Sequence, residues 1–430
     1  MKTGARAHPT LESLFRALDD EGVVWSLLRG EADLALPEGD VDLLVALEHV
    51  PRLRRIAVGL GFAPVPAWGY GSHAFFVSYD AAADLWLKLD VVTELAFGSD
   101  YALATGAEAG CLERRQRVDG LPVLSDDDAF WTLLLHRLLD KGDVGSRDAA
   151  RLPALAERAR TDGMLARTVD SLCPPGWSAG RIVAAASKSE WASLAALGPE
   201  LAASWRQARR ADVRRRTLAN RSRRWSGKLL RWRRRRGLRV ALLAPDGAGK
   251  STLTSGVQDA FYFPVRSINM GLYQVRRPRG RGHVPGLGLT RQLSRQWAGW
   301  LEGAYHQRRG RLVLFDRYAY DALLPTRFRY SRLGKARRWL LAHACPAPEL
   351  VVMLDAPGEV LYERKGEKTA ALLETQRQAY RALLSRLPRA VVVDASREAE
   401  KVRPEVTAII WREYVRRWSR RYSNRDEDTA

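Results

Sequence analysis

Apolar residues in the first part of the 430-residue chain recur at spacings typical of both helices and strands. Leu11, Leu14, Phe15 and Leu18 fall on one face of a helix, so the sequence predicts an amphipathic helix over 11–22. Apolar runs bounded by Gly, Pro and Asp predict buried strands in the same region. These predicted strands are 23–28, 41–47, 74–80 and 85–92.

The apolar pattern changes near residue 127 and again near residue 238. Residues 127–205 are rich in Ala, Leu and Arg, and their apolar positions have helical periods with few strand signals. From 238 onward, apolar strands alternate with helices, which is typical of a parallel sheet covered on both faces. The strands expected there are 239–247, 311–317, 349–356 and 389–395.

We therefore expect an α/β protein built from two folded domains, a number that also suits a chain of this length. The expected segments are an α/β domain at 1–126, a helical extension at 127–205, a basic linker at 206–237, a three-layer α/β/α domain at 238–415 and a disordered tail at 416–430.

Composition and charge narrow the class of protein. A share of 46% hydrophobic and 28% charged residues excludes a disordered or fibrous chain. The three cysteines stand far apart in no CxxC pair, which excludes a disulfide framework and a cysteine-built zinc site. No apolar run approaches a membrane span, and none follows the N-terminus as in a signal peptide, so we expect a cytoplasmic protein.

The strongest motif is Ala244-Pro245-Asp246-Gly247-Ala248-Gly249-Lys250-Ser251-Thr252, between a predicted strand and a predicted helix. It matches GxxxxGK[ST] except that Ala244 replaces the first glycine. Glycines at these positions let the backbone N–H groups of Gly247–Thr252 face one phosphate cluster at a helix N-terminus. Lys250 can then reach the β- and γ-phosphates of ATP, and the Ser251 hydroxyl can bind Mg²⁺. Asp246 would repel a nucleotide unless it faces a second substrate.

Further residues extend this pattern into a family resemblance. Asp316-Arg317-Tyr318 follow a predicted strand, and with the PDGAGKST loop they resemble thymidylate kinases, over about 238–412. The resemblance implies that Asp246, Arg317, Tyr318 and Tyr380 contact the acceptor and that Asp316 lies near the metal. It further implies a mobile lid with the cations Arg364, Lys365 and Lys368, and an adenine-side loop at Asp394. The Arg-Glu-Pro segment of that family is missing, since 265–288 is rich in Arg and Gly instead.

A group of carboxylates marks the N-terminal domain. Asp40 and Asp42 stand at i and i+2 on one predicted strand and so share a face, and Asp90 on another strand can complete a divalent-metal site. With Gly30 upstream, this pattern over 23–93 resembles the polymerase-β-like nucleotidyltransferases, which use two metal ions. Glu31 departs from the family's Gly or Ser. The alternative is a fold of this kind that has lost catalysis, and Lys88 can contact a nucleotide or pair with an acid.

Residues 206–236 hold 15 Lys/Arg and one acid, and so carry 14 of the 21 net positive charges. Trp225, Leu229 and Trp232 share one helical face within this stretch. A solvated linker helix and a helix lying on an anionic membrane both explain the pattern. We do not expect nucleic acid as a partner, because no RNA- or DNA-binding signature accompanies the arginines.

From these features we expect an ATP- and Mg²⁺-dependent kinase that phosphorylates a small phosphorylated acceptor, a nucleoside monophosphate. One alternative is a bifunctional kinase and nucleotidyltransferase acting on a sugar phosphate or nucleotide in polysaccharide biosynthesis. The other is an ATP-binding scaffold that docks to a membrane or nucleic acid through 206–236. A homodimer is compatible with any of the three.

Overall fold

The computed structural model describes residues 7–29, 34–65, 71–234, 237–271, 287–324, 331–366, 368–387 and 389–426. Within these ranges the side chains of 226–234, 287 and 420–426 are outside the description. Gly30 and Glu31, most of the Arg/Gly-rich stretch and the side chains of Leu229 and Trp232 therefore lie outside the described residues. The chain divides into two compact units, one of Met1–Ser78 and Trp86–Leu230 and one of Tyr79–Leu85 and Arg231–Ala430.

The first unit contains a mixed seven-stranded sheet with strand order β3-β4-β5-β2-β1-β9-β8 and a small β6-β7 sheet. Its strands are β1 (Trp25–Leu27), β2 (Asp40–Val45), β3 (Ala63–Pro64), β4 (His73–Asp80), β5 (Leu85–Val92), β6 (Ala96–Phe97), β7 (Leu103–Ala104), β8 (Gln116–Val118) and β9 (Leu121–Val123). β2 runs antiparallel to β1 and parallel to β5, and this register sets Asp42 beside Asp90.

Helices precede, interrupt and follow this sheet. They are α1 (Pro9–Asp20), α2 (Val50–Gly59), α3 (Glu108–Glu113), α4 (Asp126–His136), α5 (Ser146–Ala156), α6 (Met164–Asp170), α7 (Ala179–Ser187), α8 (Trp191–Ala208) and α9 (Arg210–Arg234), with short turns η2 (Leu47–His49), η3 (Ser99–Tyr101) and η4 (Arg137–Lys141). The predicted first helix is confirmed as α1, and Leu11, Leu14, Phe15 and Leu18 are all buried on it.

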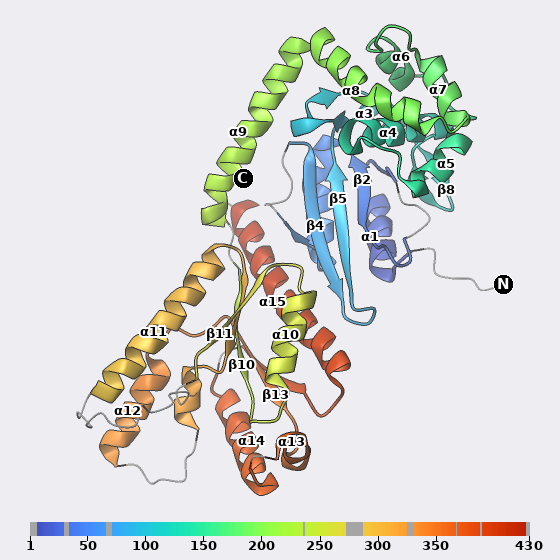
Figure 1. The fold of residues 1–430 in the computed structure, drawn as a ribbon. Helices are drawn as coiled ribbons and strands as arrows, with labels where there is room; N and C mark the ends of the chain where they lie inside the picture. The colour runs from blue at the N-terminus through green and yellow to red at the C-terminus, as the bar shows by residue number, and fades with distance from the viewer. Residues whose placement is uncertain are drawn as a thin grey trace, which may run out of the picture. The chain divides into compact units, whose positions relative to one another are not determined.

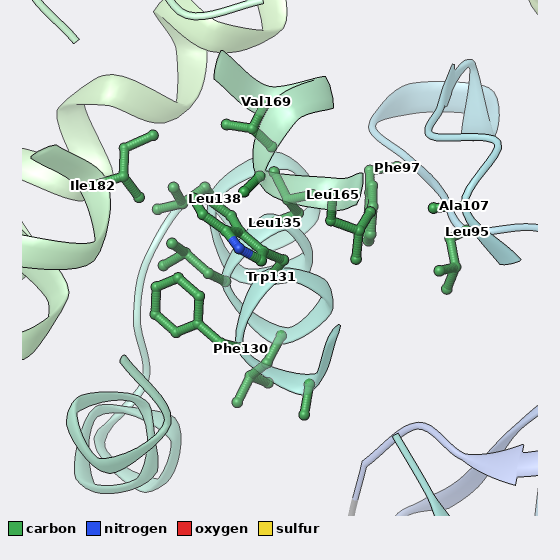
Figure 2. Packing of buried hydrophobic residues seen from close by; sticks show 14 of the residues in the cluster. Leu95, Phe97, Ala107, Phe130, Trp131, Leu135, Leu138, Leu165, Val169 and Ile182 are labelled. Carbon is green, nitrogen blue, oxygen red and sulfur yellow. The ribbon is translucent and has the colours of Figure 1, made fainter. Parts of the chain in front are cut away.

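The helical residues after 126 share a hydrophobic core with the region before them. Phe130 and Trp131 on α4 are fully buried, and their rings meet edge to face with centroids 5.0 Å apart. Leu138 and Leu165 pack around them from neighbouring segments (Figure 2). Removing a buried aromatic side chain typically costs about 3–5 kcal/mol. Helices α4–α8 therefore belong to the first compact unit.

The predicted basic linker is divided between the end of α8 and helix α9 (Arg210–Arg234), whose cations pair with acids of the first unit. Arg216 contacts both Glu94 and Asp212, and Arg221 contacts Asp100. The helix belongs to the first compact unit as far as Leu230. Part of its charge is thus neutralised within the unit, as expected for a solvated helix whose arginines meet neighbouring acids.

The second unit contains a five-stranded sheet with order β11-β12-β10-β13-β14, in which every pairing is parallel. Its strands are β10 (Arg239–Leu243), β11 (Val265–Asn269), β12 (Leu312–Asp316), β13 (Leu350–Asp355) and β14 (Ala390–Asp394). Its helices are α10 (Lys250–Ala260), α11 (Leu287–Arg308), α12 (Arg332–His343), α13 (Gly358–Lys365), α14 (Ala370–Leu384) and α15 (Ala399–Asp426), with the turn η5 (Ala319–Leu323).

Helices lie on both sides of this sheet, with α10 and α15 on one side and α11 and α12 on the other (Figure 1). The prediction of parallel strands alternating with helices is confirmed. The C-terminus differs from expectation, because α15 continues through 416 to Asp426 where a disordered tail was expected. Val406, Ile410, Trp411 and Val415 are buried along α15, so packing supports its first half. Among the described helices, none is both long and apolar enough to cross a membrane.

Candidate functional site

The phosphate loop joins β10 to α10 and requires glycine at two positions. Gly247 has φ = +90° and Gly249 has φ = +80°, a backbone region that L side chains rarely adopt. A Cβ atom at Gly247 would lie 2.6 Å from the Leu361 carbonyl oxygen, whereas one at Gly249 would meet nothing within 4 Å. Gly249 caps α10, so the free N–H groups of its first turn, which carries Ser251 and Thr252, are available to an anion.

Lys250 opens α10 and folds back over the loop. Its Nζ atom donates to the carbonyl oxygens of Ala244 at 3.2 Å and Pro245 at 3.4 Å. Burial lowers the pKa of Lys250 and the charge of Arg317 adds to this, while Asp316 acts in the opposite direction. Both backbone contacts are weak, so a phosphate oxygen can replace them.

Asp316 ends β12 directly beside β10, in register with Leu242. Its Oδ1 atom is buried and accepts no hydrogen bond from any described residue. A buried carboxylate oxygen without a donor is costly unless a cation or a water molecule contacts it. Together with the Ser251 hydroxyl at the loop, these oxygen donors are of the type Mg²⁺ prefers, so the described residues fit such an ion.

Asp246 is held between two cations. Its Oδ1 atom accepts from Arg317 Nη2 at 2.6 Å, and its Oδ2 atom accepts from Lys368 Nζ at 2.5 Å. Burial opposes ionisation of Asp246, but the hydrogen bond from Lys368 and the nearby charges of Arg317 and Lys250 outweigh it and lower its pKa to about 2. The structure thus brings together three residues far apart in sequence, from the loop, from the turn after β12 and from the segment before α14.

Arg317 adopts an unusual backbone conformation with φ = +65°. Such a conformation in a non-glycine residue costs about 1–3 kcal/mol and is found where the surrounding structure fixes a side chain for function. Here Asp321, buried and one turn further on, lies 3.5 Å from Arg317 Nη1. The Oη atom of Tyr380 donates to Asp321 at 3.0 Å, completing a chain of contacts behind the guanidinium. Burial raises the pKa of Asp321, and Arg317 opposes this rise.

Two tyrosines expected to contact an acceptor are core residues instead. Tyr318 is fully buried, packs between Phe315 and Tyr320, and donates to the Pro346 carbonyl oxygen at 2.6 Å. Tyr380 is 2% exposed and reaches Arg317 only through Asp321. Sequence reasoning missed Asp321, and the available signal was its i+4 spacing from Arg317.

A cavity of about 410 Å³ lies beside the phosphate loop. Ala248, Gly249 and Thr252 line it together with Arg364 and residues 395–403. This volume is within the range of small-ligand pockets, and one wall is the loop itself. The cavity is therefore placed where the base of a loop-bound nucleotide can lie.

Three residues predicted near the nucleotide, Arg364, Asp394 and Lys365, have the following contacts and exposure. Arg364 donates to the carbonyl oxygens of Ala395 and Ser396, so it fixes the loop after β14 and lines the base-side cavity. Asp394 accepts from the backbone N–H of Ser396 at 2.9 Å and shapes that loop from outside the cavity wall. Lys365 is exposed in the last turn of α13, whereas Lys368, in the segment before α14, contacts Asp246 of the phosphate loop.

The three predicted acids of the first unit lie together. Two of them have a partner, which is an arginine for Asp42 and a histidine for Asp90. Asp42 accepts from Arg29 Nε at 3.0 Å, and both oxygens of Asp90 lie within 3.0 Å of His73 Nδ1. Burial raises the pKa values of Asp40 and Asp42, with Lys88 opposing the rise at Asp40 and Arg29 at Asp42.

No group of three or more His, Cys, Asp or Glu side chains in the described part of the chain is arranged to hold a metal ion. Arg29 and His73, which sequence reasoning missed, occupy hydrogen-bonding positions on Asp42 and Asp90. The assignment of Asp40, Asp42 and Asp90 to a divalent-metal site therefore stays a prediction.

The chain is similar to solved structures but matches no family model and no curated protein by sequence. Among solved structures, thymidylate kinase from Candida albicans is similar at 18% sequence identity with a TM-score of 0.33. That similarity covers 42% of this chain and 93% of the other chain.

Proposed function

We propose that the second unit is an ATP- and Mg²⁺-dependent phosphotransferase whose acceptor is a small phosphorylated molecule, a nucleoside monophosphate. The observation that carries the proposal is the convergence of Lys250, Asp316, Arg317 and Asp246 at the carboxyl ends of two neighbouring parallel strands, β10 and β12. Ligands of open α/β sheets bind at this edge. A simple phosphate-binding turn has no need of the second cluster around Asp246.

The donor nucleotide lies along the loop in this proposal. The backbone N–H groups of Gly247–Thr252 surround its phosphates, and the base enters the cavity that Arg364 lines. Lys250 exchanges its two carbonyl contacts for phosphate oxygens. Ser251 and Asp316 would hold Mg²⁺, which when bound neutralises charge on the β- and γ-phosphates.

The acceptor lies on the side of Asp246. Its phosphate competes with the Asp246 carboxylate for Arg317 and Lys368, which are the cations nearest to the loop on that side. Once released, Asp246 can accept a hydrogen bond from an acceptor hydroxyl. Arg317 and Lys250 then stand on either side of the moving phosphoryl group and stabilise its charge, as such transfer requires. Lys368 belongs to the segment between α13 and α14, so acceptor binding is coupled to the position of that segment.

The test is ADP production by the full-length protein with ATP and Mg²⁺ against a panel of nucleoside monophosphates and sugar phosphates. We expect one acceptor to stimulate ADP production strongly and Lys250→Ala to reduce that rate at least about 1000-fold. Lys335→Ala, at an exposed lysine on α12, is the matched control and should retain the full rate. Near-normal turnover by Lys250→Ala, with melting temperatures unchanged, would refute the assignment.

A further inference from the structure

A second cavity lies within the first unit. It has a volume of about 1050 Å³ and is bounded by the edge of the sheet at Asp40, Asp42 and Asp90 and by helical residues of α4, η4, α5 and α8. Pockets for small molecules typically occupy about 300–1,000 Å³. All of its lining residues belong to the first unit, so the cavity is complete without the second.

Most acids in the wall of this cavity have a hydrogen-bonding or ion-pair partner, an arginine in four cases and a histidine in two. Every acidic side chain that lines it, with the exception of Asp40, has a histidine or cationic partner within the described part of the chain. These pairs are Arg29–Asp42, His73–Asp90, Arg216–Glu94, Arg221–Asp100, His136–Asp140 and Arg137–Asp148. A divalent cation entering beside Arg29 would meet a fixed positive charge 3.0 Å from the carboxylate it needs.

Two cations in the same wall are left over. Lys141, at the end of η4, and Arg206, near the end of α8, line the cavity and make no hydrogen bond or ion pair with a described residue. Both are exposed, so their charges are free to meet a ligand. Lys141 lies near enough to Asp40 for its charge to oppose the rise in the pKa of that carboxyl group, so a cation and a hydrogen-bond acceptor stand together in the wall. An ammonium group and a planar guanidinium from two different elements suit an anion with several oxygens.

We propose that this cavity is a metal-independent binding site for a small molecule that carries a phosphate group, with Lys141 and Arg206 as its anion contacts. Asp40 then accepts from a hydroxyl of the same ligand. The first unit is in this case a binding module rather than a metal-dependent transferase. The inference uses only residues of the first unit and does not depend on the kinase proposal.

The first arm of the test asks whether a metal binds. Mn²⁺ binding to the full-length protein without nucleotide is followed by electron paramagnetic resonance, for the unaltered chain and for the Asp40→Asn/Asp42→Asn double variant. We expect the two titrations to coincide. A stoichiometric Mn²⁺ site that the double variant loses would overturn the proposal, provided that circular dichroism shows the variant to be folded.

The second arm uses inorganic pyrophosphate as the probe, measured by calorimetry in EDTA. The background variant Lys250→Ala weakens competing binding at the phosphate loop. Lys141→Gln and Arg206→Gln are each expected to weaken pyrophosphate about 10-fold, and both positions are exposed, so folding should be preserved. Lys188→Gln and Arg167→Gln, at exposed cations of the first unit outside the cavity, are matched controls and should change nothing.

The outcomes separate the possibilities. Pyrophosphate binding in EDTA that falls with both cavity variants and with neither control supports the proposal. No binding in EDTA, or binding that the Lys141 and Arg206 variants leave unchanged, overturns it. Binding that appears only with Mg²⁺ and disappears in the Asp40/Asp42 double variant also overturns it, and would return the first unit to metal-dependent chemistry.

Discussion

Tyr380→Phe tests whether the buried contacts behind Arg317 position that side chain. The substitution removes one hydroxyl from a residue that is 2% exposed and takes away the 3.0 Å hydrogen bond to Asp321, which is itself 5% exposed. A hydrogen bond to a charged group contributes about 1.5–3 kcal/mol. For a unit of this size each 1 kcal/mol shifts the melting temperature by about 2–4 °C, so a loss of about 3–12 °C is expected.

The kinetic consequence should be confined to the acceptor. Arg317 contacts Asp321 and Asp246 and takes no part in the base-side cavity, so KM for the acceptor should rise about 10-fold while KM for ATP stays unchanged. The hydrogen bond from Tyr380 lowers the pKa of Asp321. Its removal should therefore move the acidic limb of the acceptor kcat/KM profile to higher pH, because Asp321 must be ionised to hold Arg317.

Steady-state kinetics with each substrate varied in turn, at several pH values, give these quantities directly. Tyr362→Phe on α13 is the matched control, since Tyr362 is 48% exposed and should tolerate the change in both assays. A lower melting temperature with unaltered acceptor kinetics would show that Tyr380 only stabilises the core. Equal increases in KM for ATP and for the acceptor would equally refute a role in positioning Arg317.

Three further outcomes follow from the contacts of the phosphate loop. Gly247→Ala should lower the free energy of unfolding by about 1–3 kcal/mol in urea titrations and weaken ATP binding, because the added Cβ atom meets Leu361. Gly366→Ala is the control: its φ is also positive but its Cβ atom meets nothing, so ATP binding should be unchanged. Arg364→Gln should raise KM for ATP about 10-fold with KM for the acceptor constant. Asp246 has a pKa of about 2 in the folded protein, below its ordinary 3.8. Its ionised carboxylate therefore stabilises the folded state by about 2 kcal/mol above pH 4, and this contribution is lost as pH falls toward 2. Asp246→Asn should remove that part of the pH dependence, and a stability difference between the two proteins that is constant from pH 5 to pH 2 would contradict it.

The parts of the fold that the sequence predicted well are those that local physics decides. Helix α1 follows from apolar residues on one face, and the turn between β10 and α10 follows from glycines that alone tolerate positive φ. Asp316 was expected at a strand end and lies there, because β12 is a buried apolar run that stops at the first acid. In each case a residue and its immediate neighbours contain the whole signal.

The tyrosines show where local reasoning stops. Tyr318 stands next to Arg317 in sequence, yet β12 ends at Asp316 and the chain turns into η5, which directs the two neighbouring side chains to different surroundings. Tyr318 reaches the carbonyl oxygen of Pro346, 28 positions away, and Tyr380 reaches Asp321, 59 positions away. Burial of this kind depends on contacts between distant segments, and a motif cannot indicate which of its members face the core.

For the carboxylates of the first unit, local sequence patterns predict their positions but not their partners. Alternation along a strand correctly put Asp40 and Asp42 on one face, and the parallel register of β2 and β5 brings Asp90 beside Asp42. What decides their chemistry is two other residues: Arg29, which follows β1 across the antiparallel ladder from Asp42, and His73, at the start of β4. The spacing of acids is the same whether or not a cation occupies the space between them. A metal ion and an arginine can each satisfy the same carboxylate. The sequence pattern of a metal site therefore also fits a pocket in which arginine takes the place of the metal. Only the identity of the residue on the neighbouring strand distinguishes the metal site from the arginine-paired site.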